Sequence, residues 1–330
     1  SKTSKNKKLF LTSNNLLSLS NRKNKCHLGV IDSPQHCGLT GGEYCAIWLG
    51  PELPGDQRLD DAFSLCFDTK ALSLEEDIVG SPELTITLEA NSPNGQLAVR
   101  LCDVFPDGKS SRITYGILNL RFRESLDSPK NISLGKEFTV KIKLDHIAYK
   151  LPKGNKLRLS LSNAYWPLVW PVNNPAKLVV KEGYLSLPLR HSARSDEWVF
   201  PDSVASKPWQ GKEIRTPRNK RQIVFDEATD EVFLDIEDDF GSYKDLQNNL
   251  VISSTAREKW SIHPHDPLSA KGETHWTEER SRGDWSIRTE TFSSMTSDKS
   301  YFYLKARVEA YEKAKLIFKK KMESKIKRVL

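Results

Sequence analysis

Short segments in which apolar and polar residues alternate recur through most of this chain, and they restrict its fold more than any other feature. Residues 84–90, 138–144 and 157–161 each carry an apolar side chain at every second position. Residues 97–104 and 113–122 are rich in β-branched and bulky side chains. Because the side chains of a strand point alternately to its two faces, each segment is predicted to be a strand with one buried face.

Turn-forming sequences lie between these segments. They combine proline, glycine and asparagine in the strings Ser92-Pro93-Asn94-Gly95, Pro106-Asp107-Gly108 and Pro152-Lys153-Gly154-Asn155. Many alternating strands joined by turns, with almost no helical periodicity, are typical of antiparallel β-sandwiches. We therefore predict a mainly β fold.

The alternation breaks once, which divides the chain into parts. Pro201, Pro208 and Pro217 occur among Ser, Arg and Lys residues in the break, and the alternation returns after residue 220. Four parts are predicted on this basis: a basic, loosely ordered lead-in over 1–40 with a short strand at 8–12, a sandwich over 41–190, a linker or crossover over 191–220, and a β-rich extension over 221–330 that packs on the sandwich.

Two signals conflict near the C-terminal end of the chain. Residues 304–327 are rich in Ala, Glu and Lys, which favours a helix. Residues 302–310 nevertheless alternate strictly, beginning with Phe302 and Leu304 on one face. Since the burial pattern usually outweighs intrinsic propensity, we predict two strands joined by a hairpin turn at Glu312-Lys313-Ala314.

The composition fits a globular protein, with 38% hydrophobic and 28% charged residues in a chain of 330. No run of about 18 apolar residues occurs, and no signal-peptide pattern is recognised, so no membrane association is expected. The five cysteines are an odd number at low density, which argues against a disulfide framework. We therefore expect a reducing compartment and a cytoplasmic location.

The net charge of +7 is concentrated at the two ends. Residues 1–25 contain seven Lys and Arg and no acid, and residues 305–330 contain ten Lys and Arg against three Glu, so the middle carries −7. Such ends attract polyanions, but aromatic side chains that could stack on bases are scarce there. We expect solvated ends and no nucleic-acid partner, with salt-sensitive binding to a polyanion as an alternative.

The chain lacks the motifs of common hydrolytic and nucleotide-binding sites. No G-x-S-x-G nucleophile elbow occurs, and the nearest string, Gly38-Leu39-Thr40-Gly41-Gly42, has a central Thr and no apolar strand before it. Neither glycine-rich phosphate-binding pattern occurs. We therefore assign no catalytic residue and no cofactor.

Three sets of residues carry metal-ligating side chains, but none has a recognised spacing. They are Cys26, His27, His36, Cys37 and Cys45; His263, His265, Asp266 and His275; and the acids Asp56, Asp60, Asp61 and Glu237-Asp238-Asp239. The first set lacks a C-x-x-C pair, the second lies partly in a proline-containing turn, and the third lacks an EF-hand spacing. No metal site is predicted, while zinc in the first set, metal or acid–base chemistry in the second and calcium in the third stay open.

The string Tyr165-Trp166-Pro167-Leu168-Val169-Trp170-Pro171 directly follows a predicted strand. Its prolines fix an extended backbone, and it carries three large aromatic side chains. Such a loop either closes the end of the core or presents Tyr165, Trp166 and Trp170 at a cleft or domain interface. Both interpretations stay open, and these three residues are the candidate cleft or interface residues.

Several longer strings resemble the C-terminal region of the CocE/NonD hydrolases, a group of cocaine-esterase-like acyl esterases and X-Pro dipeptidyl-peptidases. The strings occur in the same order as in that region, and they are residues 53–58 with Asp60-Asp61, then 97–108, 114–120, 164–167, 266–270 and 283–285. The resemblance implies a jelly-roll, galactose-binding-like sandwich that follows an α/β-hydrolase domain, in which the family's catalytic Ser, Asp and His lie.

The resemblance also implies a function. We expect the chain to be the non-catalytic C-terminal part of a serine hydrolase, packing on an α/β-hydrolase domain in cis or on a separate chain and shaping its pocket. A homo-oligomer is a further expectation, because a face left open by an absent domain favours self-association. The alternative is a stand-alone β-sandwich module that binds carbohydrate or another partner.

Overall fold

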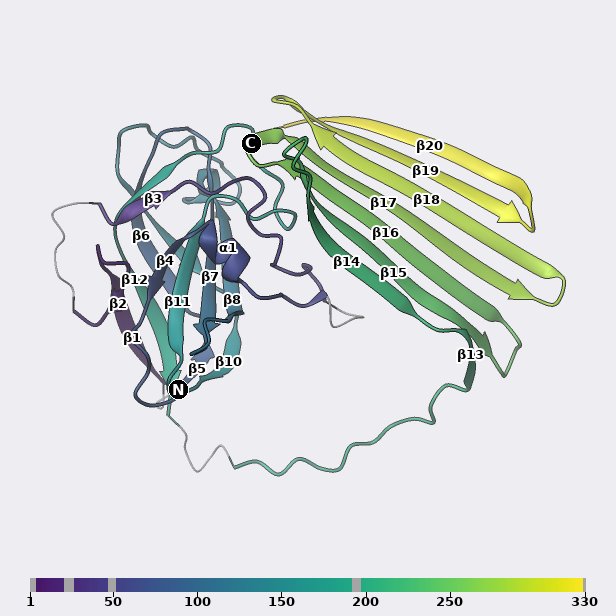
Figure 1. Cartoon of the computed structure of the whole chain (residues 1–330), viewed down its shortest axis with the longest axis horizontal. Coiled ribbons are helices and arrows are strands. Elements are labelled where there is room, and N and C mark those ends of the chain that lie inside the picture. Colours follow the sequence, from purple (N-terminus) through teal and green to yellow (C-terminus); the bar gives the residue numbers. More distant parts are fainter. Residues whose placement is uncertain (1–3, 21–26, 47–51, 192–196, 329–330) are drawn as a thin grey trace. The chain divides into compact units, whose positions relative to one another are not determined.

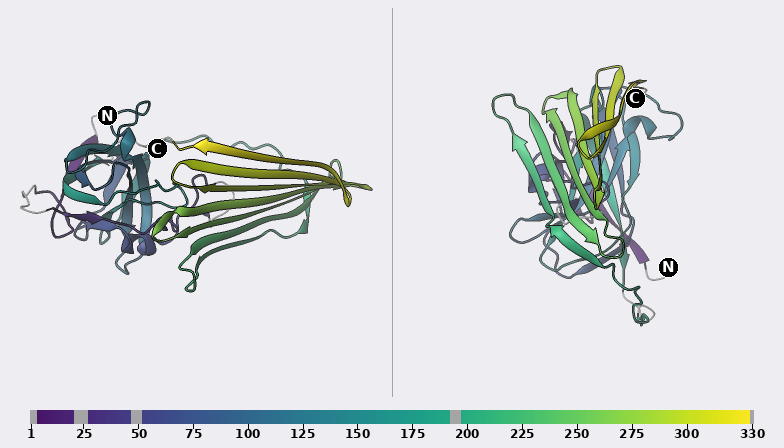
Figure 2. Two further views of the ribbon diagram at one scale, coloured as in Figure 1. Left: turned by 90° about the horizontal axis from the view of Figure 1, so that it is seen from above. Right: turned by 90° about the vertical axis from the view of Figure 1, so that its right-hand side faces the viewer.

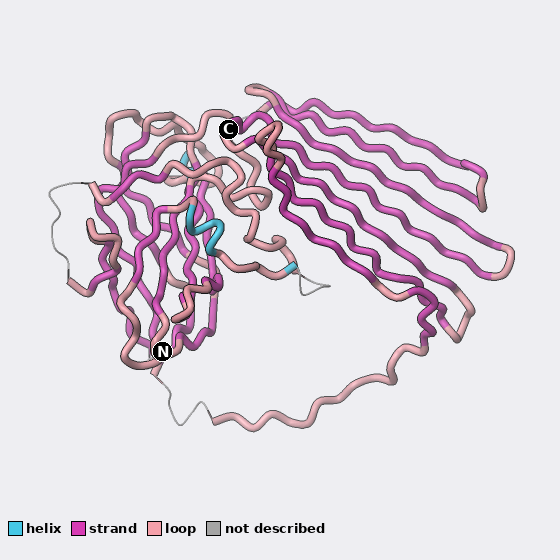
Figure 3. The backbone as a smooth tube through the Cα atoms, in the orientation of Figure 1, coloured by secondary structure: helices cyan, strands magenta, loops and turns pink. Residues whose placement is uncertain are grey.

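The computed structural model describes residues 4–20, 27–46, 52–191 and 197–328, and strands dominate it (Figure 1, Figure 3). Helical segments such as α1 (Arg58–Ala62) and the 3-10 helix η2 (Leu120–Phe122) are short. The predicted mainly β fold is confirmed. The chain divides into two compact units between Val199 and Phe200, and each unit is described separately.

The first unit contains an eight-stranded antiparallel sheet built around β12 (Leu178–Arg190). The 13 residues of β12 give it room for successive partners, because its first residues pair with β3 and its second half pairs with β1. The remaining strands of this sheet are β1 (Ser4–Leu11), β2 (Leu17–Ser18), β3 (Gly29–Ile31), β5 (Glu76–Gly80), β6 (Glu83–Ala90), β9 (Phe138–Lys143) and β10 (Ile147–Leu151).

A second, four-stranded sheet shares one hydrophobic core with the first. It contains β4 (Leu65–Asp68), β11 (Lys156–Ser162), β7 (Gln96–Val104) and β8 (Ser110–Asn119), in this order. Ile86 and Leu88 of β6 meet Leu101 of β7 and Leu159 of β11 in the same core, all at 0% exposure. Each fully buried side chain of this size contributes about 1.5–3 kcal/mol. The unit is therefore a β-sandwich, as predicted, and its jelly-roll connectivity stays a prediction.

The loosely ordered lead-in predicted for residues 1–40 is wrong for the residues described there, 4–20 and 27–40, because β1, β2 and β3 in these ranges belong to the sandwich. β1 pairs with β12 through seven consecutive residues, and Leu9 and Leu11 are buried in the core. The short strand predicted at 8–12 overlaps β1, which begins four residues earlier, at Ser4. One lysine of this added part, Lys7, forms an ion pair with Glu76. The basic composition therefore shortened the predicted strand and did not hide it.

The second unit is a single antiparallel sheet, seen as one layer of strands in both views of Figure 2. Its last six strands form an up-and-down meander, and β13 and β14 pair with opposite halves of β15. Since β13 begins at residue 211, part of the stretch predicted as a linker is strand. The strands are β13 (Gly211–Arg215), β14 (Arg218–Phe225), β15 (Val232–Asp245), β16 (Val251–His263), β17 (Asp266–Arg282), β18 (Trp285–Ser297), β19 (Tyr301–Glu312) and β20 (Lys315–Lys327).

Strands, not a helix, form the C-terminal segment in which the two sequence signals conflict. β19 and β20 pair from Tyr301 opposite Lys327 to Glu312 opposite Lys315. The turn between them places Lys313 in the left-handed region, with φ 53°. The predicted hairpin is confirmed, and the cross-strand pairing prevails over the helix propensity of Ala, Glu and Lys although the residues of β20 are exposed.

The pairing register gives the second sheet two chemically different faces, since directly opposed residues of antiparallel strands lie on the same face. We call one side the charged face, on which one row of opposed residues is Glu237, Arg257, His275, Phe292, Arg307 and Lys321. We call the other side the apolar face, on which one row is Leu234, Trp260, Gly272, Met295, Leu304 and Ser324. On this apolar face Trp260 covers Gly272, where a Cβ atom would lie 2.5 Å from the indole ring.

None of the helices in the described part of the chain is long and apolar enough to cross a membrane.

Candidate functional site

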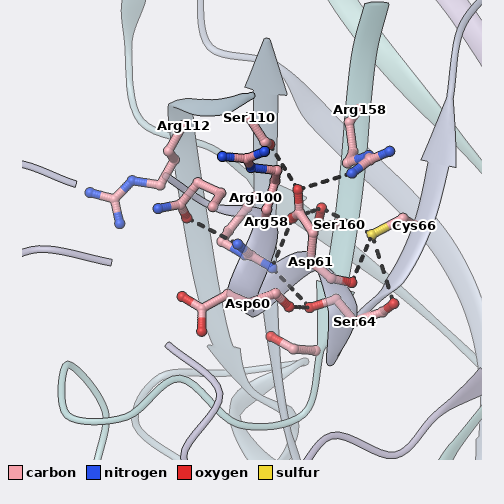
Figure 4. Close-up of polar contacts among 12 residues, drawn as sticks. Arg58, Asp60, Asp61, Ser64, Cys66, Arg100, Ser110, Arg112, Arg158 and Ser160 are labelled. Carbon is pink, nitrogen blue, oxygen red and sulfur yellow. Dashed lines mark hydrogen bonds and ion pairs between the residues drawn. The ribbon is translucent and has the colours of Figure 1, made fainter. Parts of the chain in front are cut away.

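Charged and hydroxyl side chains gather in the interior of the first unit, around α1 and the smaller sheet (Figure 4). The short helix supplies two consecutive carboxylates, Asp60 and Asp61, at 0% and 6% exposure, and β7 supplies Arg100 at 0%. Buried charges are costly unless each is paired and hydrogen-bonded. We call the whole set the ionic cluster, and its members are Gln57, Asp60, Asp61, Ser64, Arg100, Ser110, Arg158 and Ser160.

Asp61 is the centre of the ionic cluster. Its two carboxylate oxygens accept hydrogen bonds from the hydroxyls of Ser110 and Ser160, each at 2.7 Å. They also form ion pairs with Arg100 at 3.2 Å and Arg158 at 3.1 Å. Four donors from three strands therefore converge on one carboxylate, which fixes β7, β8 and β11 relative to α1.

Asp60 fixes a loop rather than a strand. Its carboxylate accepts hydrogen bonds from the backbone N–H of Gly38 at 2.8 Å and of Thr40 at 3.0 Å, and from the Thr40 hydroxyl. The Gln57 amide donates to the carbonyls of Thr40 at 2.7 Å and Gly55 at 2.9 Å. The two side chains thus hold both ends of the segment from residue 38 to residue 55.

Arg100 connects these two parts of the cluster. Its guanidinium donates to the Gln57 side-chain oxygen at 3.0 Å and to the Ser64 hydroxyl at 2.8 Å, in addition to its ion pair with Asp61. Because Arg100 is fully buried, loss of its partner Asp61 would leave an uncompensated charge in the interior. The arrangement is that of a rigid structural clamp.

The thiols around the cluster are not reactive groups. Burial, reinforced by the nearby carboxylates, raises the pKa of Cys37 and Cys102 to about 12 and that of Cys66 to about 11. These thiols stay protonated near neutral pH, and a protonated thiol is neither a good nucleophile nor a metal ligand. Of the other members of the first set, in which zinc was left open, Cys45 is exposed and Cys26 lies outside the described residues.

The three candidate cleft residues have different positions. Tyr165 and Trp166 are buried, at 1% and 0% exposure, whereas Trp170 is half-buried. The Tyr165 hydroxyl accepts a hydrogen bond from Arg112 at 2.6 Å, and the Trp166 and Trp170 rings meet edge to face at 5.3 Å. Of the three, Trp170 therefore keeps a side chain that a docked domain could contact.

The loop that carries these aromatics touches the loop that Asp60 fixes. The Trp166 backbone N–H donates to the Cys37 carbonyl at 2.8 Å. Gly38 has a φ of 119°, and a Cβ atom there would lie 2.6 Å from the Trp166 carbonyl oxygen. Only glycine allows this close approach of the two backbones.

The cluster contains hydroxyl groups and acids but no nucleophile–base pair. The hydroxyls of Ser110 and Ser160 donate to Asp61, and that of Ser64 donates to the Asp60 carbonyl at 2.6 Å. A serine nucleophile needs a base such as histidine and access for the substrate. These serines are hydrogen-bonded to acids or backbone inside the protein, so the cluster is structural.

The three histidines of the second set, His263, His265 and His275, do not share one site. His263 and His265 lie beside the turn between β16 and β17, with ring centroids 5.9 Å apart. His275 stacks on Phe292 at 4.0 Å and lies 3.1 Å from a carboxylate oxygen of Glu290. Among the residues that the structure describes, no three His, Cys, Asp or Glu side chains converge as a metal site.

Both aspartates stand out in the sequence as possible ligands, but the arginines that pair with them were not predicted. Arg100 and Arg158 each have an apolar residue on both sides within a strand, and this was the available signal. A charge within a buried strand requires a partner of opposite charge. The adjacent acids Asp60 and Asp61 are such partners, but their pairing with strands 39 to 97 residues away follows only from the fold.

Comparisons with known proteins agree with this architecture. A family model described as the X-Pro dipeptidyl-peptidase C-terminal non-catalytic domain matches residues 1–191. The cocaine esterase of Rhodococcus sp. (strain MB1 Bresler) is 26% identical over 137 residues, which are 40% of this chain and 24% of that protein. The family predicted from the sequence is confirmed. The match to the family model ends at residue 191, before the second unit begins.

Two solved structures share the fold of part of the chain. An α-amino acid ester hydrolase, labelled with selenomethionine, superposes with a TM-score of 0.51 at 18% identity, over 56% of this chain and 36% of that chain. An aminopeptidase from the marine sediment archaeon Thaumarchaeota archaeon gives a TM-score of 0.51 at 14% identity, over 57% and 37%. The chain thus spans 24% to 37% of the length of these relatives.

Proposed function

Because the chain belongs to the X-Pro dipeptidyl-peptidase C-terminal non-catalytic domain family, we propose that it is the accessory β-rich part of a serine hydrolase of the acyl-esterase or X-Pro dipeptidyl-peptidase type. In this proposal the catalytic serine and its base belong to an α/β-hydrolase domain, in cis or on a separate chain. The small share of each relative that the chain spans supports this, since most of a hydrolase of their length lies outside the match.

The observation that carries the proposal is the rigid contact between two loops. The ionic cluster holds Gly38, Thr40 and Gly55 through Asp60 and Gln57, and Gly38 lies against the backbone of Trp166. Loops held in one conformation before binding lose little entropy when another domain docks on them. A preformed surface of this kind suits a permanent interface with a catalytic domain.

In the proposed assembly, Trp170 lines one side of the substrate pocket and limits the size of the acyl or peptide group. The reaction would be attack of the catalytic serine on an ester or amide carbonyl, followed by hydrolysis of the acyl-enzyme. The residues of this chain would contact the substrate or the catalytic domain without exchanging protons with the reacting atoms.

The first test uses the 330-residue chain alone with a fluorophosphonate probe and a nitrophenyl ester. We expect neither labelling nor turnover, because the described serines of the ionic cluster have no histidine base. Stoichiometric labelling of any serine in this chain would overturn the proposal.

The second test combines the chain with the α/β-hydrolase domain encoded with it. We expect Trp170→Ala to change KM and the preference between small and bulky acyl groups, with little change in the melting temperature. Trp285→Ala removes a tryptophan from the second unit, at 43% exposure, and is the matched control. Equal kinetic effects of the two substitutions, or none from either, would exclude the pocket role of Trp170.

A further inference from the structure

A long hollow lies on the charged face of the second unit. Its volume is about 490 Å³, and residues from every strand from β15 to β20 line it. Five inter-strand spacings of about 4.8 Å give it a length of about 24 Å across the sheet. The hollow is therefore elongated, which suits a chain-like ligand that crosses the strands.

The pairing register shows which side chains form the walls. One wall is the row from Arg257 to Lys321 that defines the charged face. The other wall is the next row on the same face, two residues further along each strand, and it consists of Asp235, Lys259, Glu273, Ser294, Lys305 and Glu323. The small residues Thr274, Ser293 and Ala306 form the floor between the rows through their backbone.

The walls carry more positive than negative charge. The hollow is lined on the charged face by five lysine or arginine side chains and by three carboxylates. These groups together carry a net charge of +2. Arg257 and Arg307 also pair with Glu237 and Glu309, which lie outside the hollow. Within the described residues, no ion pair or hydrogen bond engages the ammonium groups of Lys305 and Lys321. These two lysines are therefore available to an incoming anion.

The centre of the first wall is a stack of three planar groups. The Phe292 ring lies 4.0 Å from the His275 ring at an angle of 14°, and the Arg307 guanidinium lies 4.0 Å from its centroid. Neighbours thus cover both faces of the phenyl ring. A nucleobase could not stack on Phe292, and such stacking is a main source of affinity for single-stranded nucleic acid.

We propose that this hollow binds an acidic polysaccharide, a sugar chain that bears carboxylate groups. Its carboxylates would accept hydrogen bonds from the lysines and arginines, and its hydroxyls would donate to the Asp235, Glu273 and Glu323 carboxylates. A densely phosphorylated polymer would be repelled most by Glu323, because Lys220 and Lys271 pair with Asp235 and Glu273. A sugar chain with both group types matches the alternation of cations and acids along the walls.

The proposal is independent of the hydrolase function. The hollow lies wholly in the second unit, beyond residue 191, where the family match ends. An acyl esterase or peptidase activity could be absent and the binding present, or the reverse.

The test measures binding of a galacturonic acid hexamer to the full chain by calorimetry at low salt. The double substitution Lys305→Gln and Lys321→Gln removes two charges from the hollow. It breaks no ion pair among the residues that the structure describes. We expect about tenfold weaker binding, the combined effect of losing two solvent-exposed charge pairs. The methyl-esterified hexamer keeps the hydroxyls but lacks the carboxylates. It should bind the unsubstituted chain at least as weakly as the acidic hexamer binds the double variant.

The matched control is Lys315→Gln with Lys327→Gln. It removes the same amount of charge at two positions of β20 that lie outside the hollow. We expect the control to weaken binding by no more than about twofold. The proposal would be overturned by absence of hexamer binding, by equal weakening in both double variants, or by tighter binding of single-stranded DNA or poly-glutamate of similar charge.

Discussion

The two units of this chain start from the same alternating sequence pattern and stabilise it in different ways. In the first unit two sheets enclose one core, so a charge left inside must be fully paired, as Asp61 and Arg100 are. In the second unit a single sheet carries its charges on an open face, where Lys220 pairs with Asp235 at 2.8 Å while both stay partly exposed. The same type of ion pair should therefore contribute very differently to stability in the two units.

The largest expected effect comes from breaking the buried cluster. Asp61→Ala leaves Arg100 buried without its counter-ion and removes the acceptor of two serine hydroxyls. We expect the first unit to lose about 3–5 kcal/mol of stability. The measurement is urea denaturation with hydrogen exchange of β7 peptides as the readout.

The matched substitution in the second unit is Asp235→Ala, read from β15 peptides. Because its ion pair is exposed, we expect a loss of at most about 1 kcal/mol. Similar losses for the two substitutions would show that the ionic cluster is not the clamp described here, and that the contrast between the units is false.

Alternation was sufficient to predict the strands whose two faces differ. Residues 84–90 and 302–310 were both recognised, although one lies in a sandwich and the other in a single layer. The pattern could not separate these two cases, because it reports that one face is apolar and not what covers it. It also missed the first half of β1, from Ser4 to Lys7, although the strand predicted at 8–12 contains the buried Leu9 and Leu11.

The site was less predictable than the fold. The motif with Gln57, Asp60 and Asp61 was recognised as a family feature, but its role depends on arginines from distant strands. Asp61 and Arg158 are 97 residues apart, so no local pattern links them. The aromatic loop was recognised from composition, yet the burial of Tyr165 and Trp166 depends on the close approach of Gly38 and Gly41 to them.

The next effect in size concerns the contact between the two loops of the first unit. Gly38→Ala would place a Cβ atom 2.6 Å from the Trp166 carbonyl oxygen in a backbone with φ 119°. Gly108→Ala has a similar backbone, with φ 87°, but nothing lies within 4 Å of its Cβ position. We expect about 1–2 kcal/mol of destabilisation from the backbone strain at Gly108, and about 1–3 kcal/mol more at Gly38 from the clash. Equal melting temperatures of the two variants would contradict the rigid loop contact.

The smallest expected effect depends on pH and belongs to the charged face of the second unit. The hydrogen bond from Lys319 to Glu309, at 2.7 Å, lowers the pKa of this carboxyl below its ordinary 4.5, and the Tyr311 hydroxyl adds to the shift. A lowered carboxyl pKa stabilises the folded form above the unfolded pKa, and this contribution is lost as the pH falls through the folded pKa. Glu309→Gln should therefore lower the melting temperature at pH 7, by less than either substitution in the first unit, and the difference should shrink as the pH falls below 4.5 and vanish below the folded-state pKa. Glu312→Gln, the same change at the end of β19, is the control and should have little effect at either pH. If the Glu309→Gln difference persisted at low pH, the side chain would act through packing and not through its charge, and the charged face would then resemble the enclosed core more than an open ionic surface.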